Sequence, residues 1–138
     1  MNRESILRVA LWCAALFNTG GALLFAFPES SIGQFIGLPA VVPIVYLAFV
    51  AFFILLFAGA YVWLAIQKPI IKSFVAFGAM GKAGAFVLTL ILWLAGSVSW
   101  RGVLTGSGDL ILAATFAWCI VGTQQGVRAR GSMETRVS

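Results

Sequence analysis

The sequence predicts an all-α fold, a four-helix transmembrane bundle with antiparallel, up-down topology. Three observations predict it: 62% of the 138 residues are hydrophobic, only 9% are charged, and the mean hydropathy is +1.05. A soluble domain carries roughly 25% charged residues, and at this size it buries only about 70% of the surface of its unfolded chain. The apolar surface that stays outside therefore needs lipid as its solvent.

The four apolar runs cover residues 6–27, 42–66, 73–95 and 103–123. Each is long enough to cross a hydrocarbon core of roughly 30 Å, which takes about 20 helical residues. The second run has no charged residue and offers no polar face to water, which excludes a soluble helical bundle. All of the runs exceed the roughly 9 to 11 residues of a transmembrane β-strand and lack its alternation. Residues 1–125 thus form a transmembrane domain, and residues 126–138 form a polar cytoplasmic tail. We expect no stable structure for the polar residues 124–138.

The first run begins like a signal peptide, because Arg3 and Arg8 lie at its start. It is longer than the roughly 7 to 15 residues of a signal-peptide core and has no A-x-A cleavage site, so we expect it to stay in the protein. The segment 28–43, which follows, is rich in Gly, Ser and Pro and contains the amphipathic stretch 32–39. This stretch predicts a short helix that lies in the membrane interface.

The positions of the cationic residues predict the orientation of the chain. Seven Lys and Arg residues precede the first run, join the second to the third, or follow the fourth: Arg3, Arg8, Lys68, Lys72, Arg128, Arg130 and Arg136. With four spans these regions share one side of the membrane, and only Arg101 lies on the other side. Cytoplasmic loops carry the excess of Lys and Arg, so we expect both termini in the cytoplasm. The net charge of +5 follows from this pattern and predicts no nucleic-acid partner.

Two charged residues lie inside the predicted spans, where each costs about 2.5 to 3.5 kcal/mol and needs a partner. Lys82 lies about 14 Å from the cytoplasmic side and Asp109 about 9 Å from the outer side, at a rise of about 1.5 Å per residue. A lysine side chain can bridge the remaining difference in depth. Asn18 reaches the same layer of the membrane. We therefore predict an intramembrane polar cluster of Asn18, Lys82 and Asp109.

The cluster has two interpretations, between which the sequence does not decide. The ion pair either fixes the register of the helices or forms a site for a ligand, an ion or a proton. Thr19, Thr89 and Ser107 are candidates for the surroundings of the cluster, whereas Tyr61 is expected too close to the cytoplasmic end to belong to it. The pair Gly102-x-x-x-Gly106 predicts packing within the bundle, with a homodimer seam as the alternative.

Several short motifs follow one another along nearly the whole chain before the tail: Asn18 with Gly21, Pro28, Gly37-Leu38-Pro39, Gly59-Ala60-Tyr61, Gly81-Lys82, and Asp109. In their order and spacing these motifs resemble a group of small bacterial four-span membrane proteins, loosely similar to the DoxX-like families, most of which lack an assigned activity. The resemblance implies a four-helix bundle in the bacterial inner membrane. It also places Asn18, Lys82 and Asp109 among the positions of the pattern.

Motifs for catalysis are missing: the chain has no His, its two Cys residues form no CxxC pair, and no phosphate-binding loop, nucleophile elbow or HExxH occurs. We therefore expect no cofactor and no metal site, and we expect membrane lipids, a second copy or another membrane protein as partners. The favoured hypothesis is a non-enzymatic accessory or interaction protein. The alternative is a small transporter or channel that binds substrate or protons at Lys82 and Asp109. A membrane enzyme or quinone-linked redox subunit is suggested only by the DoxX-like resemblance.

Overall fold

The computed structural model describes the backbone of residues 2–38 and 42–134, and the side chains of this part up to residue 121. Within these residues the chain is all-helical and has no strand, which confirms the predicted fold class. The helices are α1 (Arg3–Ala26), α2 (Ser31–Ile36), α3 (Ile44–Ile66), α4 (Lys72–Leu94) and α5 (Trp100–Glu134).

Four of these helices are long and apolar enough to cross a membrane, namely α1, α3, α4 and the segment Trp100–Val121 of α5. Their bounds differ from those of the predicted runs by three residues or fewer at each end. The short helix predicted within residues 32–39 is also present, as α2.

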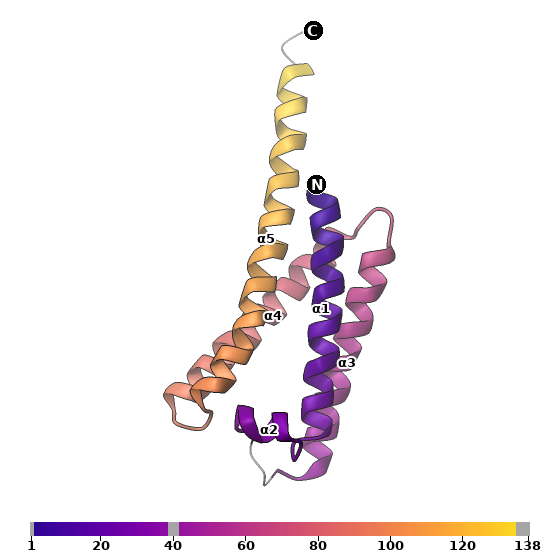
Figure 1. The fold of residues 1–138 in the computed structure, drawn as a ribbon. Helices are drawn as coiled ribbons and strands as arrows, with labels where there is room; N and C mark the ends of the chain where they lie inside the picture. The colour runs from indigo at the N-terminus through magenta and orange to yellow at the C-terminus, as the bar shows by residue number, and fades with distance from the viewer. Residues whose placement is uncertain (1, 39–41, 135–138) are drawn as a thin grey trace.

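The expectation that residues 124–138 are unstructured is wrong for residues 124–134, because α5 continues without a break to Glu134 (Figure 1). Starting a new helix is costly, whereas extending an existing one adds a hydrogen bond for each residue that is fixed. The membrane-spanning part of α5 supplies the existing helix, and Gln, Arg, Met and Glu in the extension are good helix formers.

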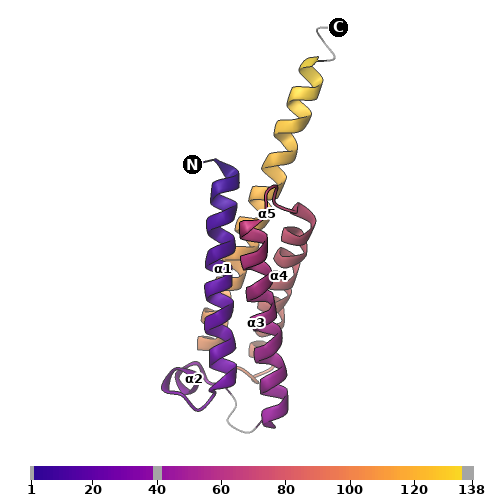
Figure 2. The same cartoon turned by 90° about the vertical axis from the view of Figure 1, so that its right-hand side faces the viewer.

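Successive long helices run in alternate directions and form two closely packed pairs, α1 with α3 and α4 with α5 (Figures 1 and 2). The pairs meet mainly where α1 packs against α5. We call the end of the bundle that carries Arg3 and the connection 67–71 the terminal end, and the opposite end, with α2 and the connection 95–99, the α2 end (Figure 1).

The hydrophobic core occupies the half of the bundle nearest the terminal end. Its fully buried side chains are Leu11, Val75, Phe116 and Cys119. The buried residues of α3 begin only at Ala58, and those of α4 end at Lys82. Toward the α2 end the two helix pairs diverge (Figure 1). Lys82 therefore lies at the boundary between a packed half and a diverging half.

Helix α2 lies across the α2 end and is bonded to the start of α5. The Ser99 hydroxyl donates to the Ile36 carbonyl oxygen at 2.7 Å, and the Arg101 guanidinium donates to the Phe35 carbonyl oxygen at 3.2 Å. Helix α2 ends at Gly37, whose φ of 82° is the left-handed conformation that glycine adopts without strain. These bonds satisfy carbonyl groups that the end of α2 leaves without a partner in the helix.

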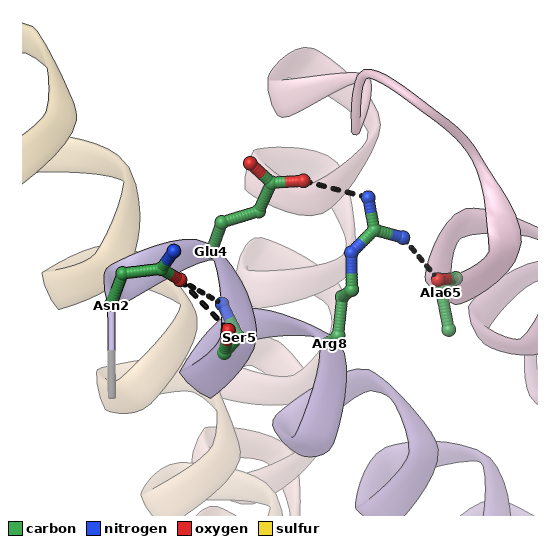
Figure 3. Close-up of polar contacts among 5 residues, drawn as sticks. All are labelled: Asn2, Glu4, Ser5, Arg8 and Ala65. Carbon is green, nitrogen blue, oxygen red and sulfur yellow. Dashed lines mark hydrogen bonds and ion pairs between the residues drawn. The ribbon is translucent and has the colours of Figure 1, made fainter.

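At the terminal end, side chains of α1 cap α1 itself and also α3 (Figure 3). The Asn2 side-chain oxygen accepts a hydrogen bond from the backbone N–H of Ser5 at 2.8 Å, as an N-cap residue does. The Arg8 guanidinium pairs with Glu4 at 2.7 Å and donates to the carbonyl oxygen of Ala65, in the last turn of α3. One arginine thus joins α1 to α3 where the carbonyl groups of α3 have no partner within the helix.

Replacing Arg8 by methionine is expected to lower the free energy of unfolding by about 1.5 to 3 kcal/mol, the range for a hydrogen bond to a charged group. Glu4→Gln is the matched control, because it removes an exposed ion pair and keeps the bond to Ala65; its expected cost is about 0.5 kcal/mol. Both values can be measured by unfolding in mixed micelles of SDS and a nonionic detergent. If Arg8→Met and Glu4→Gln lowered the free energy of unfolding equally, the bond from Arg8 to Ala65 would not be the stabilising contact.

Candidate functional site

The structure brings together the three residues of the predicted cluster. The Lys82 ammonium donates to Asp109 Oδ1 at 2.6 Å and to Asn18 Oδ1 at 2.8 Å. The Lys82 side chain is only 4% exposed, whereas that of Asp109 is 20% exposed. The cation is therefore enclosed by protein, and the anion keeps some contact with the surroundings.

Two aromatic rings complete the surroundings of the ammonium. Lys82 Nζ lies 5.2 Å from the centroid of the Phe17 ring and 5.3 Å from that of the Tyr61 ring, within the distance at which a cation is attracted to a ring face. We call Phe17, Asn18, Tyr61 and Asp109 the ammonium cage. Helices α1, α3 and α5 supply the cage, and α4 supplies the cation within it.

The helical period explains why these residues meet. On α4, Val75, Gly78 and Lys82 follow at spacings of three and four residues, so they share the buried face of the helix. On α5, Asp109 precedes the buried Ala113 and Phe116 at the same spacings. The charged residue thus lies at the end of a buried stripe on each helix.

Asn18 is oriented by both ends of its amide. Its Nδ2 donates to the backbone carbonyl oxygen of Ile54 on α3 at 3.4 Å, and its Oδ1 accepts from Lys82. In the part of the chain whose side chains are described, every buried side-chain nitrogen and oxygen has a hydrogen-bond partner. The polar cluster is therefore satisfied, as a buried network must be to avoid a desolvation penalty.

Each aromatic ring of the cage packs against a glycine. The Tyr61 hydroxyl donates to the Gly78 carbonyl oxygen at 3.3 Å, and a Cβ at Gly78 would lie 2.8 Å from the Tyr61 ring. A Cβ at Gly108 would lie 2.6 Å from the Phe17 ring. Both glycines thus permit a close approach that a larger residue would prevent.

Replacing Gly108 by alanine is expected to push the Phe17 ring away from Lys82 and to cost about 1 to 3 kcal/mol of stability, as overpacking does. Gly20→Ala is the matched control on α1, because no atom lies within 4 Å of the added Cβ. Since alanine favours a helix, the control is expected to be neutral or stabilising by up to about 1 kcal/mol. Melting temperatures of the two variants in the same detergent would test the difference, and a Gly108→Ala variant as stable as wild type would refute it.

The prediction that Tyr61 lies outside the cluster is wrong, because it considered only the depth of the backbone. In a helix the side chain points back toward the N-terminal end of that helix. On α3 this direction leads from the terminal end toward the middle of the bundle, which brings the Tyr61 ring to Lys82. Phe17 was not predicted either, although it is adjacent to Asn18.

The three hydroxyl residues suggested as surroundings of the cluster bond to their own helices instead. Thr19 donates to Ala15, Thr89 to Ala85, and Ser107 to Leu104, in each case to the backbone carbonyl oxygen. A hydroxyl inside a membrane helix is readily satisfied by the preceding turn, so it needs no partner on another helix.

Of the Gly102-x-x-x-Gly106 pair, Gly106 packs inside the bundle, because a Cβ there would contact the Thr89 side chain on α4 at 3.6 Å. A Cβ at Gly102 would lie 2.5 Å from Val98, in the connection that precedes its own helix. The Gly106 contact agrees with the interpretation as internal packing, and the homodimer seam stays a prediction. In contrast, Gly81 and Gly84 on α4 are exposed and have no such neighbour within 4 Å.

Among the residues searched, which are those that the structure describes, no group of three His, Cys, Asp or Glu lies together to hold a metal ion. The groups that surround the Lys82 ammonium are one carboxylate, one amide and two ring faces. No protein-family model matches the chain, and the comparisons with curated proteins and with solved structures give no match either.

Proposed function

We propose that this chain is a non-catalytic, multi-pass protein of the bacterial inner membrane that acts as an accessory or interaction protein. In this proposal the Lys82 cluster holds the two helix pairs together in the middle of the membrane. Both termini lie in the cytoplasm. The resemblance to small bacterial four-span proteins and the lack of catalytic motifs in the sequence support the assignment.

The enclosed ion pair is the observation that carries the proposal. Lys82 is 4% exposed, and its ammonium bonds to oxygen atoms of α1 and α5. Fixing the arrangement of helices is the best-attested use of a buried ion pair. In lipid there is no hydrophobic force between helices, so hydrogen bonds and packing decide which helices associate.

The proposed orientation follows from the charges at the two ends. Arg3, Arg8 and Lys72 belong to the terminal end, and Arg101 belongs to the α2 end. Cysteines introduced at Lys68 and Ser97, in a background with Cys13 and Cys119 changed to alanine, can be labelled with a membrane-impermeant maleimide. We expect labelling of Ser97→Cys in intact cells and of Lys68→Cys only after the membrane is permeabilised. The opposite order would refute the orientation.

Helix α4 offers a surface on which a partner helix can pack. Gly81 and Gly84 are exposed, and membrane helices approach one another most closely at small residues. A photo-cross-linking amino acid at position 84 is expected to give one discrete adduct in the native membrane, which Gly81→Leu abolishes. The same amino acid in place of Trp12, an exposed residue of α1, is the control. Equal adducts at both positions would count against a specific partner surface.

A small transporter is the second candidate function, and the partial exposure of Asp109 favours it. The carboxylate is 20% exposed and pairs with Lys82, the last buried residue of α4. A transported cation or proton would need such an accessible acid. Flux into proteoliposomes that is abolished by removing both charges, in Lys82→Met/Asp109→Asn, would support transport. Equal flux through this variant and wild type would exclude it.

A further inference from the structure

The ammonium cage contains each group that recognises a primary ammonium ion. A carboxylate oxygen of Asp109 lies 2.6 Å from the nitrogen, and an amide oxygen of Asn18 lies 2.8 Å from it. The rings of Phe17 and Tyr61 lie at 5.2 and 5.3 Å. Charge-assisted hydrogen bonds and ring faces are the interactions through which proteins bind ammonium groups.

The cation within the cage belongs to a different helix from the cage itself. Phe17 and Asn18 are on α1, Tyr61 is on α3 and Asp109 is on α5, whereas Lys82 reaches them from α4. Lys82 is therefore comparable to an alkylammonium ligand attached to α4 through its unbranched chain. A free ligand of the same chemistry would make the same contacts.

For a free ligand to enter the cage, the Lys82 side chain, which is 4% exposed, must first leave it. A lysine side chain in a membrane helix can extend along the helix and place its charge near the interface. The partly exposed Asp109 would then be available to a second cation.

We propose that the ammonium cage is a recognition site for a primary alkylammonium ligand, and that Lys82 occupies it in this structure as a tethered competitor. Its physiological use rests on the second candidate function, in which a cation exchanges with Lys82 at Asp109. Recognition of the ammonium itself depends only on the geometry of the four cage residues.

Binding of radiolabelled n-butylammonium to the purified protein in detergent tests the proposal. Lys82→Ala removes both the competing charge and the side chain that fills the cage, so this variant is expected to bind about tenfold more tightly than wild type. Lys82→Ala/Asp109→Asn is the matched control, because it carries neither charge and is expected to lose specific binding. An excess of n-butanol, which has no charge, is expected not to displace the label.

The proposal is tested by comparing the affinity for n-butylammonium of wild type with the affinities of the variants. If Lys82 were only a part of a binding site, its removal would weaken binding, so a Lys82→Ala variant that binds no better than wild type would overturn the proposal. Binding retained in the double variant would do the same. The stability of Lys82→Ala provides a second readout, since n-butylammonium should raise its melting temperature, or its yield of monodisperse protein, and n-butanol should not. If the affinities for n-butylammonium followed the expected order while proteoliposomes showed no flux, that result would reject the transport function and would still support the recognition site.

Discussion

Replacing Asp109 by leucine is expected to lower the free energy of unfolding by about 3 to 5 kcal/mol, the range for removing one partner of a buried ion pair. The loss is large because the Lys82 side chain is 4% exposed and its charge would lack a counterion in the interior of the bundle. Unfolding in mixed micelles, followed by tryptophan fluorescence, measures this quantity.

Two further variants show how much of the Asp109→Leu effect comes from leaving the Lys82 charge buried without a partner, and how much from losing the contact itself. Lys82→Met is expected to cost less than Asp109→Leu, since the Asp109 side chain is 20% exposed and its charge is less completely enclosed than that of Lys82. The double variant Lys82→Met/Asp109→Leu contains no uncompensated charge, so it is expected to be more stable than Asp109→Leu alone. A double variant that loses the sum of both single effects would show that the two residues do not interact.

Replacing Tyr61 by alanine is the second change for which we expect a large effect. Tyr61 is buried, packs against Phe116 with ring centroids 5.8 Å apart, and forms one side of the ammonium cage. Truncating a buried aromatic residue costs about 3 to 5 kcal/mol in soluble proteins. Because lipid is as apolar as the core, Tyr61→Ala loses packing contacts but no transfer free energy between water and the core. We therefore expect it to lower the free energy of unfolding by about 2 to 4 kcal/mol.

Tyr61→Phe is the matched control, because it keeps the ring and removes only the hydrogen bond to the Gly78 carbonyl oxygen. Its expected cost is about 0.5 to 1.5 kcal/mol. Phe52→Ala on the exposed face of α3 should be close to neutral, since its ring has little protein to pack against. A Phe52→Ala variant as unstable as Tyr61→Ala would show that the core is not confined to the terminal half.

Much of the fold could be predicted from the sequence because the hydrocarbon core sets the length of each span. The arrangement of the helices could not be predicted in the same way. Helices α3 and α4 are joined by a short connection, yet few contacts link them, among them the hydrogen bond from the Tyr61 hydroxyl to the Gly78 carbonyl oxygen. Helix α3 carries no charge and is apolar on every side, so its sequence does not indicate which side faces a neighbour.

For the site, the cost of a charge in lipid made the pairing of Lys82 with Asp109 predictable. The aromatic side of the cage was not predictable, because aromatic residues make up 14% of the chain and nothing marks Phe17 among them. Tyr61 was excluded by a depth argument that ignored the direction of its side chain. The Tyr61 side chain points back toward the N-terminal end of α3, and this direction brings its ring near Lys82.

The divergence of the two helix pairs toward the α2 end has a consequence for the bilayer around the protein. A bundle that is wider at one end occupies more area in one leaflet than in the other (Figure 1). Such a wedge fits best where the membrane is curved toward its broad end. The energy of inserting this protein should then depend on the spontaneous curvature of the surrounding lipids.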